Sequence, residues 1–294
     1  MSEKIFNEVL CLKQDITEND YQELKNLETI CTTKDRVSLK LELYYKLNLS
    51  KSTEIGISKI NEFFYYINDE LVSYLGISSY STNIAEINGM THPKYRRKGL
   101  FQKLFQLAMD ECHRRKFEKI LLLTDEASTS GISFINSTSA EYEFSEYRMR
   151  ALCHKPANRS SSITMRKANH LDKKEISRQN IIYFNDPEVT EDNYSIDDHN
   201  LNSTYMVELQ DETIGKICIE YTNSSAYIFG FGILEEFRGN GYGRAALTEA
   251  MNICYQNNFH EIELDVACKN RNALNLYSSC GFEVQSVMKY YAVT

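Results

Sequence analysis

A short segment rich in glycine and arginine could bind a phosphate-bearing ligand. It reads Arg-Gly-Asn-Gly-Tyr-Gly-Arg over residues 238–244 and follows an apolar run that ends at Leu234. A glycine-rich turn between a strand and a helix points several backbone N–H groups at one place, and the helix dipole adds partial positive charge there. Glycine also keeps side chains away from the anion. We predict an anion-binding loop here; the alternative is a tight turn that binds nothing.

Two other phosphate-binding motifs do not fit this segment. The dinucleotide fingerprint Gly-x-Gly-x-x-Gly would need a small third residue, but Arg244 stands at that position. A P-loop would need the ending Gly-Lys-Ser/Thr, which the segment lacks. Neither motif would account for a second, similar segment elsewhere in the chain.

That second segment, residues 95–101, indicates an internal repeat. Its arginine and glycine, Arg96 and Gly99, each lie 142 positions before their counterparts (238 − 96 and 241 − 99). At the same offset, Asp69–Glu70 meets Asp211–Glu212, and the matches continue through the following helix. An ungapped register of this length predicts a duplicated domain.

The hydrophobic pattern predicts the same elements in both halves. Strand-like runs cover residues 63–68, 84–91 and 119–124, and their counterparts cover 204–210, 226–234 and 261–267. A turn and a further strand follow the first run of each half, and an amphipathic helix follows each loop. Each half is therefore expected to be an α/β domain with a mixed, mostly antiparallel sheet flanked by helices. Before these strands we expect a long helical region at 18–48, a shorter helix at 173–185 and an acidic loop at 188–203.

Length and composition set the class of protein. A chain of 294 residues suggests two domains. We place them at residues 1–156 and 160–294, with the boundary inside 154–162, where Pro, Asn and Ser cluster. The net charge of −8 disfavours a nucleic-acid partner, and no apolar run is long enough to cross a membrane. Eight scattered cysteines and six histidines without ligand spacing favour reduced thiols, a cytoplasmic location and no metal site.

At these residues the sequence resembles the GNAT superfamily of N-acetyltransferases. The family signature Arg/Gln-x-x-Gly-x-Gly/Ala is matched by Arg238, Gly241 and Gly243. A second family element, a helix followed by Gly-Phe, is matched by Asn270, Ala273, Leu276, Tyr277 and Gly281–Phe282. The first half matches the loop at Arg96 and Gly99 but departs at Phe101, where Gly or Ala is usual. The resemblance thus implies two GNAT-like domains in tandem.

The resemblance implies that acetyl-CoA is the cosubstrate and that a primary amine attacks the thioester directly, without metal. The adjoining strand would splay from its neighbour and admit the pantetheine arm. The implied coenzyme contacts are Ile233, Leu234, Glu235, Arg238, Gly239, Asn240, Gly241, Tyr242, Gly243, Arg244 and Asn270. Backbone N–H groups near Ile233 to Glu235 would polarise the thioester carbonyl. Tyr277 would protonate the departing sulfur, since a phenol of pKa about 10 is matched to a thiolate; the alternative is that Tyr277 only packs in the core.

The first half is expected to have lost this chemistry. At the 142 offset, Tyr277 falls on Ile135 and Asn270 on Ser128. A displaced tyrosine, Tyr142 or Tyr147, remains an alternative, and Phe101 is expected to crowd the helix start. Further candidate coenzyme contacts in this half are Arg96, Arg97, Lys98, Gly99, Leu100 and Phe101.

Three questions stay open at this point. No general base is assigned; the candidates are Tyr227, Glu86, Glu235, Glu236, Glu263, Asp265 and a relayed water. The expected function is N-acetylation in the second half, and the alternatives are an acyl-CoA sensor without activity or catalysis by the first half. The chain is expected to be a monomer or a homodimer.

Overall fold

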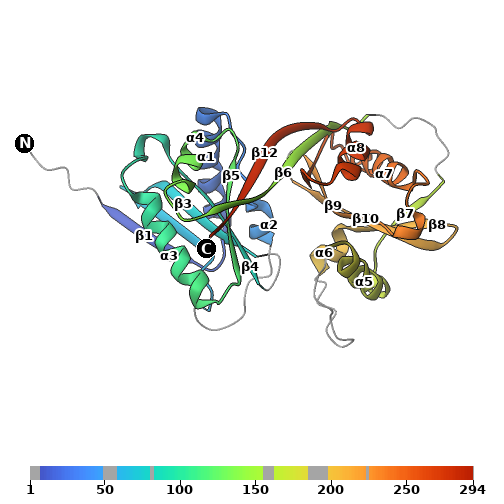
Figure 1. The fold of residues 1–294 in the computed structure, drawn as a ribbon, viewed down its shortest axis with the longest axis horizontal. Coiled ribbons are helices and arrows are strands. Elements are labelled where there is room, and N and C mark those ends of the chain that lie inside the picture. Colours follow the sequence, from blue (N-terminus) through green and yellow to red (C-terminus); the bar gives the residue numbers. More distant parts are fainter. Residues whose placement is uncertain are drawn as a thin grey trace, which may run out of the picture. The chain divides into compact units, whose positions relative to one another are not determined.

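The computed structural model describes residues 7–48, 58–79, 83–154, 162–184, 198–222 and 225–293. The chain divides into two compact units (Figure 1). One consists of Met1–Ser145 with Ser286–Thr294, and the other of Glu146–Gln285. The expected limits at residues 156 and 160 fall among residues 155–161, which lie outside the described residues.

The first unit is a six-stranded sheet covered by helices. Its strands are β1 (Glu8–Lys13), β2 (Glu62–Ile67), β3 (Glu70–Ser78), β4 (Ile84–Thr91), β5 (Lys119–Asp125) and the end of β12 (Glu283–Val293), in that order. Its helices are α1 (Glu18–Asp35), α2 (Leu43–Asn48), α3 (Leu100–Arg114) and α4 (Thr129–Ile135). Among its described residues β4 and β5 pair in parallel, and β1–β2, β2–β3, β3–β4 and β5–β12 pair antiparallel.

The second unit repeats this plan. Its sheet order is β6 (Glu141–Leu152), β11 (Glu261–Ala267), β10 (Ala226–Ile233), β9 (Glu212–Tyr221), β8 (Thr204–Leu209) and β7 (Thr164–Lys167). Its helices are α5 (Lys173–Phe184), α6 (Asp198–Ser203), α7 (Tyr242–Gln256) and α8 (Arg271–Ser279). The parallel pair is β10 with β11. The expected fold class is therefore confirmed.

Helices cover both faces of each sheet, because the strands carry apolar side chains on both faces. In the first unit, α3 and α4 bury one face, with Leu104 and Phe105 in its core. The other face packs on α1 through residues such as Leu24 and Leu27. In the second unit, α7 and α8 share a core with the sheet, and α5 contributes Ile176 to the opposite face.

Two expectations about the leading helical regions need correction. The region at 18–48 is two helices, because α1 ends at Asp35, where the C-cap Arg36 has a left-handed φ of 56°, and α2 begins only at Leu43. The start of α1 is fixed by a capping box between Thr17 and Asp20. Within the expected acidic loop, residues 198–203 form α6, and residues 188–197 lie outside the described residues.

The β2–β3 and β8–β9 hairpins are tight turns, as predicted. Asn68 and Asp69 have φ values of 49° and 62°, and Gln210 and Asp211 have 50° and 67°. Positive φ at two consecutive residues is the turn geometry that matches the twist of antiparallel strands. The repeat thus extends to backbone conformation.

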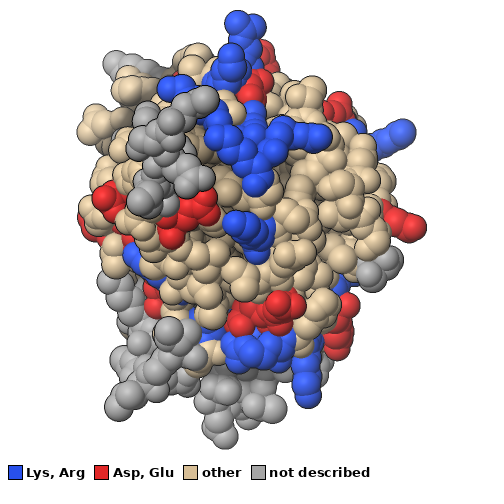
Figure 2. Space-filling model, turned by 90° about the vertical axis from the view of Figure 1, so that its left-hand side faces the viewer, with Lys and Arg blue, Asp and Glu red and all other residues tan. Residues whose placement is uncertain are grey.

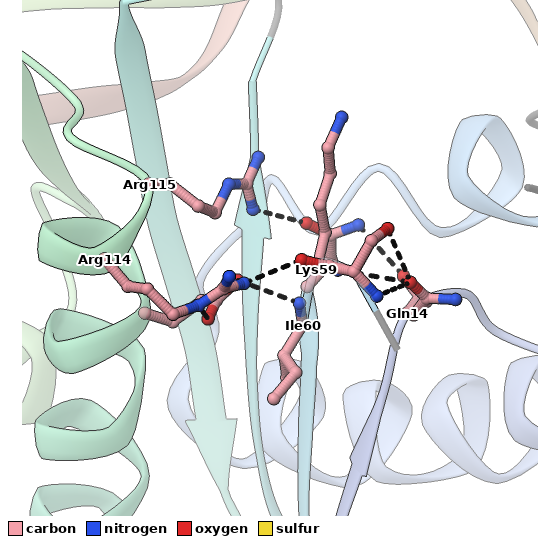
Figure 3. A network of polar contacts seen from close by, with 8 residues as sticks. Gln14, Lys59, Ile60, Arg114 and Arg115 are labelled. Carbon is pink, nitrogen blue, oxygen red and sulfur yellow. Dashed lines mark hydrogen bonds and ion pairs between the residues drawn. The ribbon is translucent and has the colours of Figure 1, made fainter. Parts of the chain in front are cut away.

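A polar network holds the C-terminal end of α3 against the segment that leads into β2 (Figure 3). Arg114 donates to the Ser58 carbonyl at 2.8 Å, and Glu111 accepts from the Ile60 N–H at 3.0 Å. Burial opposes ionisation of Glu111, but hydrogen bonds from Arg114 and Ile60 lower its pKa overall. The network therefore fixes α3, whose other end forms the loop described below.

Candidate functional site

The loop before α7 presents a row of unused backbone donors. Gly239 and Gly241 have φ values of 81° and 84°, and a Cβ at either position would meet nothing within 4 Å. Among the described residues, none accepts a hydrogen bond from the N–H groups of residues 239–244. The N-terminus of a 15-residue helix with free N–H groups and adjacent open space is suited to a phosphate.

The two arginines of this loop are held by backbone carbonyls. Arg238 donates through Nε to the Ile233 carbonyl at 2.8 Å, and Arg244 donates to the Ser279 carbonyl at 2.9 Å. Asn240 similarly donates to the carbonyls of Phe237 and Arg238, at 3.2 Å each. These side chains brace the loop and leave its N–H groups free of partners among the described residues.

The strand that leads to this loop separates from its parallel neighbour. The pairing of β10 with β11 covers only Ala226 to Ile228 on β10, whereas its pairing with β9 continues to Ile233. The β9 pairing shifts register between Phe229 and Gly232, which marks a bulge. Bulges re-aim backbone groups and are common beside active sites. Both the separation from β11 and the bulge lie at the end of β10 that leads into the loop.

Sequence reasoning missed the bulge, although the Gly-Phe-Gly run at 230–232 signals it. Gly230 has a φ of 56°, which a larger residue rarely adopts. The structure also changes the expected donors for a thioester carbonyl. The N–H of Leu234 donates to the Ile214 carbonyl at 2.9 Å, so it is already engaged.

Asn270 and Tyr277 lie at opposite ends of α8. Asn270 caps the helix by accepting from the Ala273 N–H at 3.2 Å. Tyr277 is buried, with its ring edge-on to Phe282 at 5.9 Å. Burial raises the pKa of Tyr277 to about 12, above the value assumed from the sequence. The hydroxyl is therefore protonated throughout the physiological range.

Two of the candidate bases are engaged in ion pairs across the β6–β11 pairing. Asp265 accepts two hydrogen bonds from Arg148, at 2.9 and 3.0 Å, and Glu263 accepts one from Arg150 at 2.9 Å. Such cross-strand pairs stabilise the sheet. They leave these carboxylates poorly placed to take a proton from an acceptor.

The first unit carries an equivalent loop before α3. Gly99 has a φ of 78° with open space around it, and Arg97 takes a left-handed φ of 62° where the second unit has Gly239. Arg96 donates to the Thr91 carbonyl at 3.0 Å and forms a 2.6 Å ion pair with Asp35. Among the described residues, the N–H groups of residues 97–102 have no acceptor. The loop geometry is thus preserved in both units.

Phe101 does not crowd the helix start, contrary to expectation. Its ring lies edge-on to Phe134 at 4.8 Å and extends over Gly89 on β4. At the same offset, the second unit has Gly243, Leu276 and Phe231 at these three positions. The aromatic ring comes from the helix in one unit and from the strand in the other, so the departure from the family signature is compensated.

A cavity of about 760 Å³ adjoins the loop of the first unit, which sequence reasoning did not anticipate. Its wall includes Asn88, Tyr95, Gly99, Ser128 and Asp125. The Asn88 Oδ1 is buried and has no hydrogen-bond partner among the described residues, while its amide nitrogen donates to the Lys40 carbonyl. The pairing of β4 with β5 also stops early, at Ile87. This volume is within the usual range for a small-molecule pocket.

Tyr142 and Tyr147, the two residues considered as displaced counterparts of Tyr277, do not line this cavity. Ile135, at the equivalent position, is buried. Tyr142 is 58% exposed, with its ring against Tyr291, and Tyr147 pairs with Val266 in the second unit. The tyrosine that does line the cavity is Tyr95, which donates to Glu70 at 3.1 Å.

Other chemistry has little structural support. In the described part of the chain, no three His, Cys, Asp or Glu side chains gather as a metal site would require. None of the eight cysteines, all of which lie in the described part of the chain, forms a disulfide. No helix among the described residues is long and apolar enough to cross a membrane.

Both units thus share one α/β plan, and each has a glycine-containing loop at the start of a helix that is suited to an anion. The model of the acetyltransferase (GNAT) family matches residues 22–136 and again 173–282. The chain therefore belongs to the acetyltransferase (GNAT) family and contains two copies of its domain in tandem. The expectation of a tandem GNAT protein is confirmed.

The chain is similar in sequence to two proteins described as N-acetyltransferases. The chain is 31% identical over 86 residues to N-alpha-acetyltransferase 50 of Danio rerio, covering 28% of this chain and 51% of that protein. It is 30% identical over 69 residues to the uncharacterised N-acetyltransferase YycN of Bacillus subtilis, covering 24% and 44%. The chain thus spans about half the length of these relatives.

Two solved structures share the fold along almost the whole chain. A GCN5-related N-acetyltransferase from Sphaerobacter thermophilus has a TM-score of 0.77 at 17% identity, with 97% of this chain and 95% of that chain covered. A tandem GNAT protein from the clavulanic acid biosynthesis pathway has a TM-score of 0.69 at 11% identity, with 98% of each chain covered.

Proposed function

We propose that the protein transfers an acetyl group from acetyl-CoA to a primary amine of a small molecule or peptide, with the chemistry in the second unit. The supporting observation is the bulged end of β10, which parts from β11 immediately before six free N–H groups. The pyrophosphate would lie on the N–H groups of residues 239–244, and the pantetheine arm between the two strands. In the first unit, the pairing of β4 with β3 has no register shift.

The proposed mechanism is direct attack by a neutral amine, with the backbone at the β10 bulge polarising the thioester carbonyl. Tyr277 supplies a hydrogen bond to the departing sulfur. With the pKa of Tyr277 at about 12 and that of a thiol at about 8.5, full proton transfer from the phenol to the thiolate is unfavourable. Tyr277 therefore stabilises the thiolate as a donor, and the proton that the attacking nitrogen loses as the C–S bond breaks passes through water to the thiolate.

The partners follow from the same proposal: a coenzyme A thioester and an amine, with no nucleic acid, membrane or metal. The face of the protein in Figure 2 carries acidic and basic side chains next to one another, and the net charge is −8. A nucleic-acid surface would need a basic excess. We place the protein in the cytoplasm, as a monomer or homodimer.

A second candidate assigns acyl-CoA binding, or the catalysis itself, to the first unit. The cavity beside Gly99 and the unpaired Asn88 Oδ1 favour it. In the extreme form of this candidate, the protein binds acyl-CoA and transfers no acetyl group. In this candidate the second unit would only complete the fold.

Calorimetric titration with acetyl-CoA, combined with matched glycine variants, distinguishes these possibilities. Gly241→Asp places a carboxylate where the pyrophosphate would lie, and Gly241→Asn is its neutral control, since both residues tolerate the left-handed backbone. Gly99→Asp and Gly99→Asn repeat the test in the first unit. The proposal expects Gly241→Asp to abolish acetyl transfer and one binding site, while Gly241→Asn retains both.

The remaining outcomes have clear meanings. Loss of transfer in Gly99→Asp, with Gly241→Asp active, would move the chemistry to the first unit. Two binding sites in the wild type, each removed by one Asp variant, would make both cavities coenzyme sites. Absence of any acetyl-CoA binding would overturn the proposed function.

A further inference from the structure

The ring of Tyr183, near the end of α5, lies directly on the bulged part of β10. A Cβ built on Gly232 would come within 2.6 Å of the ring atoms Cδ2, Cε2 and Cζ of Tyr183. Such overlap with three ring atoms means that only glycine at residue 232 lets the ring approach the strand this closely. The structure therefore places a phenol ring against β10 where it has left β11.

The hydroxyl of Tyr183 is buried and has no hydrogen-bond partner among the described residues. Leaving a buried polar group unpaired is energetically costly, so such groups are uncommon in folded proteins and often belong to functional sites. By contrast, the hydroxyl of Tyr66, which is also a half-buried tyrosine, donates to Glu23 at 2.8 Å. An unmet hydrogen bond at Tyr183 indicates that a ligand supplies it.

The surroundings of this hydroxyl connect it to the proposed active site. Burial raises the pKa of Tyr183, and the charges of Arg238, Glu175, Arg178 and Glu236 act on it from nearby. Arg238 is the residue that donates to the Ile233 carbonyl at the end of β10. The hydroxyl thus lies beside the strand end where a thioester would be held, and it is neutral, with lone pairs that can accept a hydrogen bond.

We propose that Tyr183 binds the acceptor: its hydroxyl oxygen accepts a hydrogen bond from the N–H of the primary amine and directs the nitrogen lone pair at the thioester carbonyl. Gly232 is the positioning residue that allows this placement. The inference rests on the proposed function of the second unit and adds an acceptor-binding residue to it. Tyr183 takes no proton in this role, so no base is assigned to it.

The test is steady-state kinetics of thiol release from acetyl-CoA with spermidine, glucosamine and glycylglycine as probe amines. Tyr183→Phe removes only the hydroxyl, and we expect the KM for the accepted amine to rise about tenfold, the effect of one lost hydrogen bond. The acetyl-CoA dissociation constant should stay within about twofold. The melting temperature should not fall, because the hydroxyl has no partner to lose among the residues that the structure describes.

Two further variants sharpen the test. Gly232→Ala should displace the ring and raise the amine KM in the same direction. Tyr221→Phe is the control, since Tyr221 lies at the end of β9 that pairs with Ala226, away from the bulge and the loop. We expect it to leave the amine KM unchanged.

The failures are distinguishable. A wild type that acetylates a probe amine, together with an unchanged amine KM in Tyr183→Phe, overturns the role of Tyr183 and leaves the proposed function standing. A wild type that releases no thiol with any of the three amines contradicts the proposed function, and the role of Tyr183 with it.

Discussion

The ring of Phe101 lies over Gly89, and the two residues are matched to each other. A Cβ on Gly89 would come within 2.8 Å of Phe101 Cε2 and 2.9 Å of the Leu75 Cα, and it would overlap the Tyr74 carbonyl oxygen. In the second unit the strand carries Phe231 and the helix carries Gly243, whose Cβ would lie 3.9 Å from the Phe231 ring. One aromatic ring fills the space in each unit, and the opposite residue is glycine.

This relationship predicts that Gly89→Ala lowers the stability of the first unit by about 2 kcal/mol, because overpacking against backbone atoms forces the strands to shift. Replacing Phe101 with Ala in the same chain should not rescue it, since the clash with Tyr74 and Leu75 is with backbone. Urea denaturation of both single variants and the double variant measures this. Full rescue by Phe101→Ala would show that only the ring conflicts with a side chain at residue 89.

Arg96 is expected to act mainly on the fold. It is bonded to the Thr91 carbonyl and ion-paired with Asp35, and both members of the pair are partly exposed. Arg96→Gln should therefore lower stability by about 1 kcal/mol and weaken acetyl-CoA binding little. Thermal melting and calorimetric titration check the two parts. A large loss of binding at unchanged melting temperature would instead assign Arg96 to the phosphate.

Tyr277 should set the size of kcat without shaping its pH dependence below about pH 11. The phenol donates only when protonated, and with its pKa at about 12 it stays protonated as the pH rises through the range where amines become neutral. The rate should thus rise with amine deprotonation and then remain level. Tyr277→Phe should lower kcat about 100-fold with acetyl-CoA affinity retained. A falling limb near pH 10 in the wild type would contradict this assignment.

The buried ion pair beneath α2 is expected to be sensitive to one-sided substitution. Lys46 donates to both oxygens of Glu62, at 2.9 and 3.1 Å, and Tyr74 also donates to Glu62; all three side chains are buried. Lys46→Met leaves the carboxylate uncompensated and should cost about 3 kcal/mol. Adding Glu62→Gln should recover part of that loss. Equal stability of Lys46→Met and the wild type, measured by urea unfolding, would refute the prediction.

Much of this structure follows from local sequence patterns. Strand-like apolar runs predicted β4 at residues 84–91 and β11 at residues 261–267 with the bounds observed. The glycines at residues 99 and 241 predicted a loop that opens a helix, and both adopt a left-handed φ there, which suits glycine. The break between α1 and α2 was missed, since residues 37–42 carry no glycine or proline to signal it.

The candidate site was only partly predictable, because some of its residues lie close together along the chain and others do not. The loop lies in a contiguous motif, whereas the cavity wall gathers residues from α1, β4, β5 and α4 that no motif links. The contact between Tyr183 and Gly232 spans 49 positions (232 − 183), and neither residue belongs to the family signature. Packing between distant segments made these features.

By itself, the sequence determined the duplication, the two loops and the order of helices and strands, because each depends on residues close together along the chain. Tertiary structure alone decided which strand completes each sheet. Residues 288–293 pair with β5 in the first unit, and residues 146–152 pair with β11 in the second. Strand pairing across such separations depends on which edges meet in the folded chain, and apolar alternation is the same for either partner.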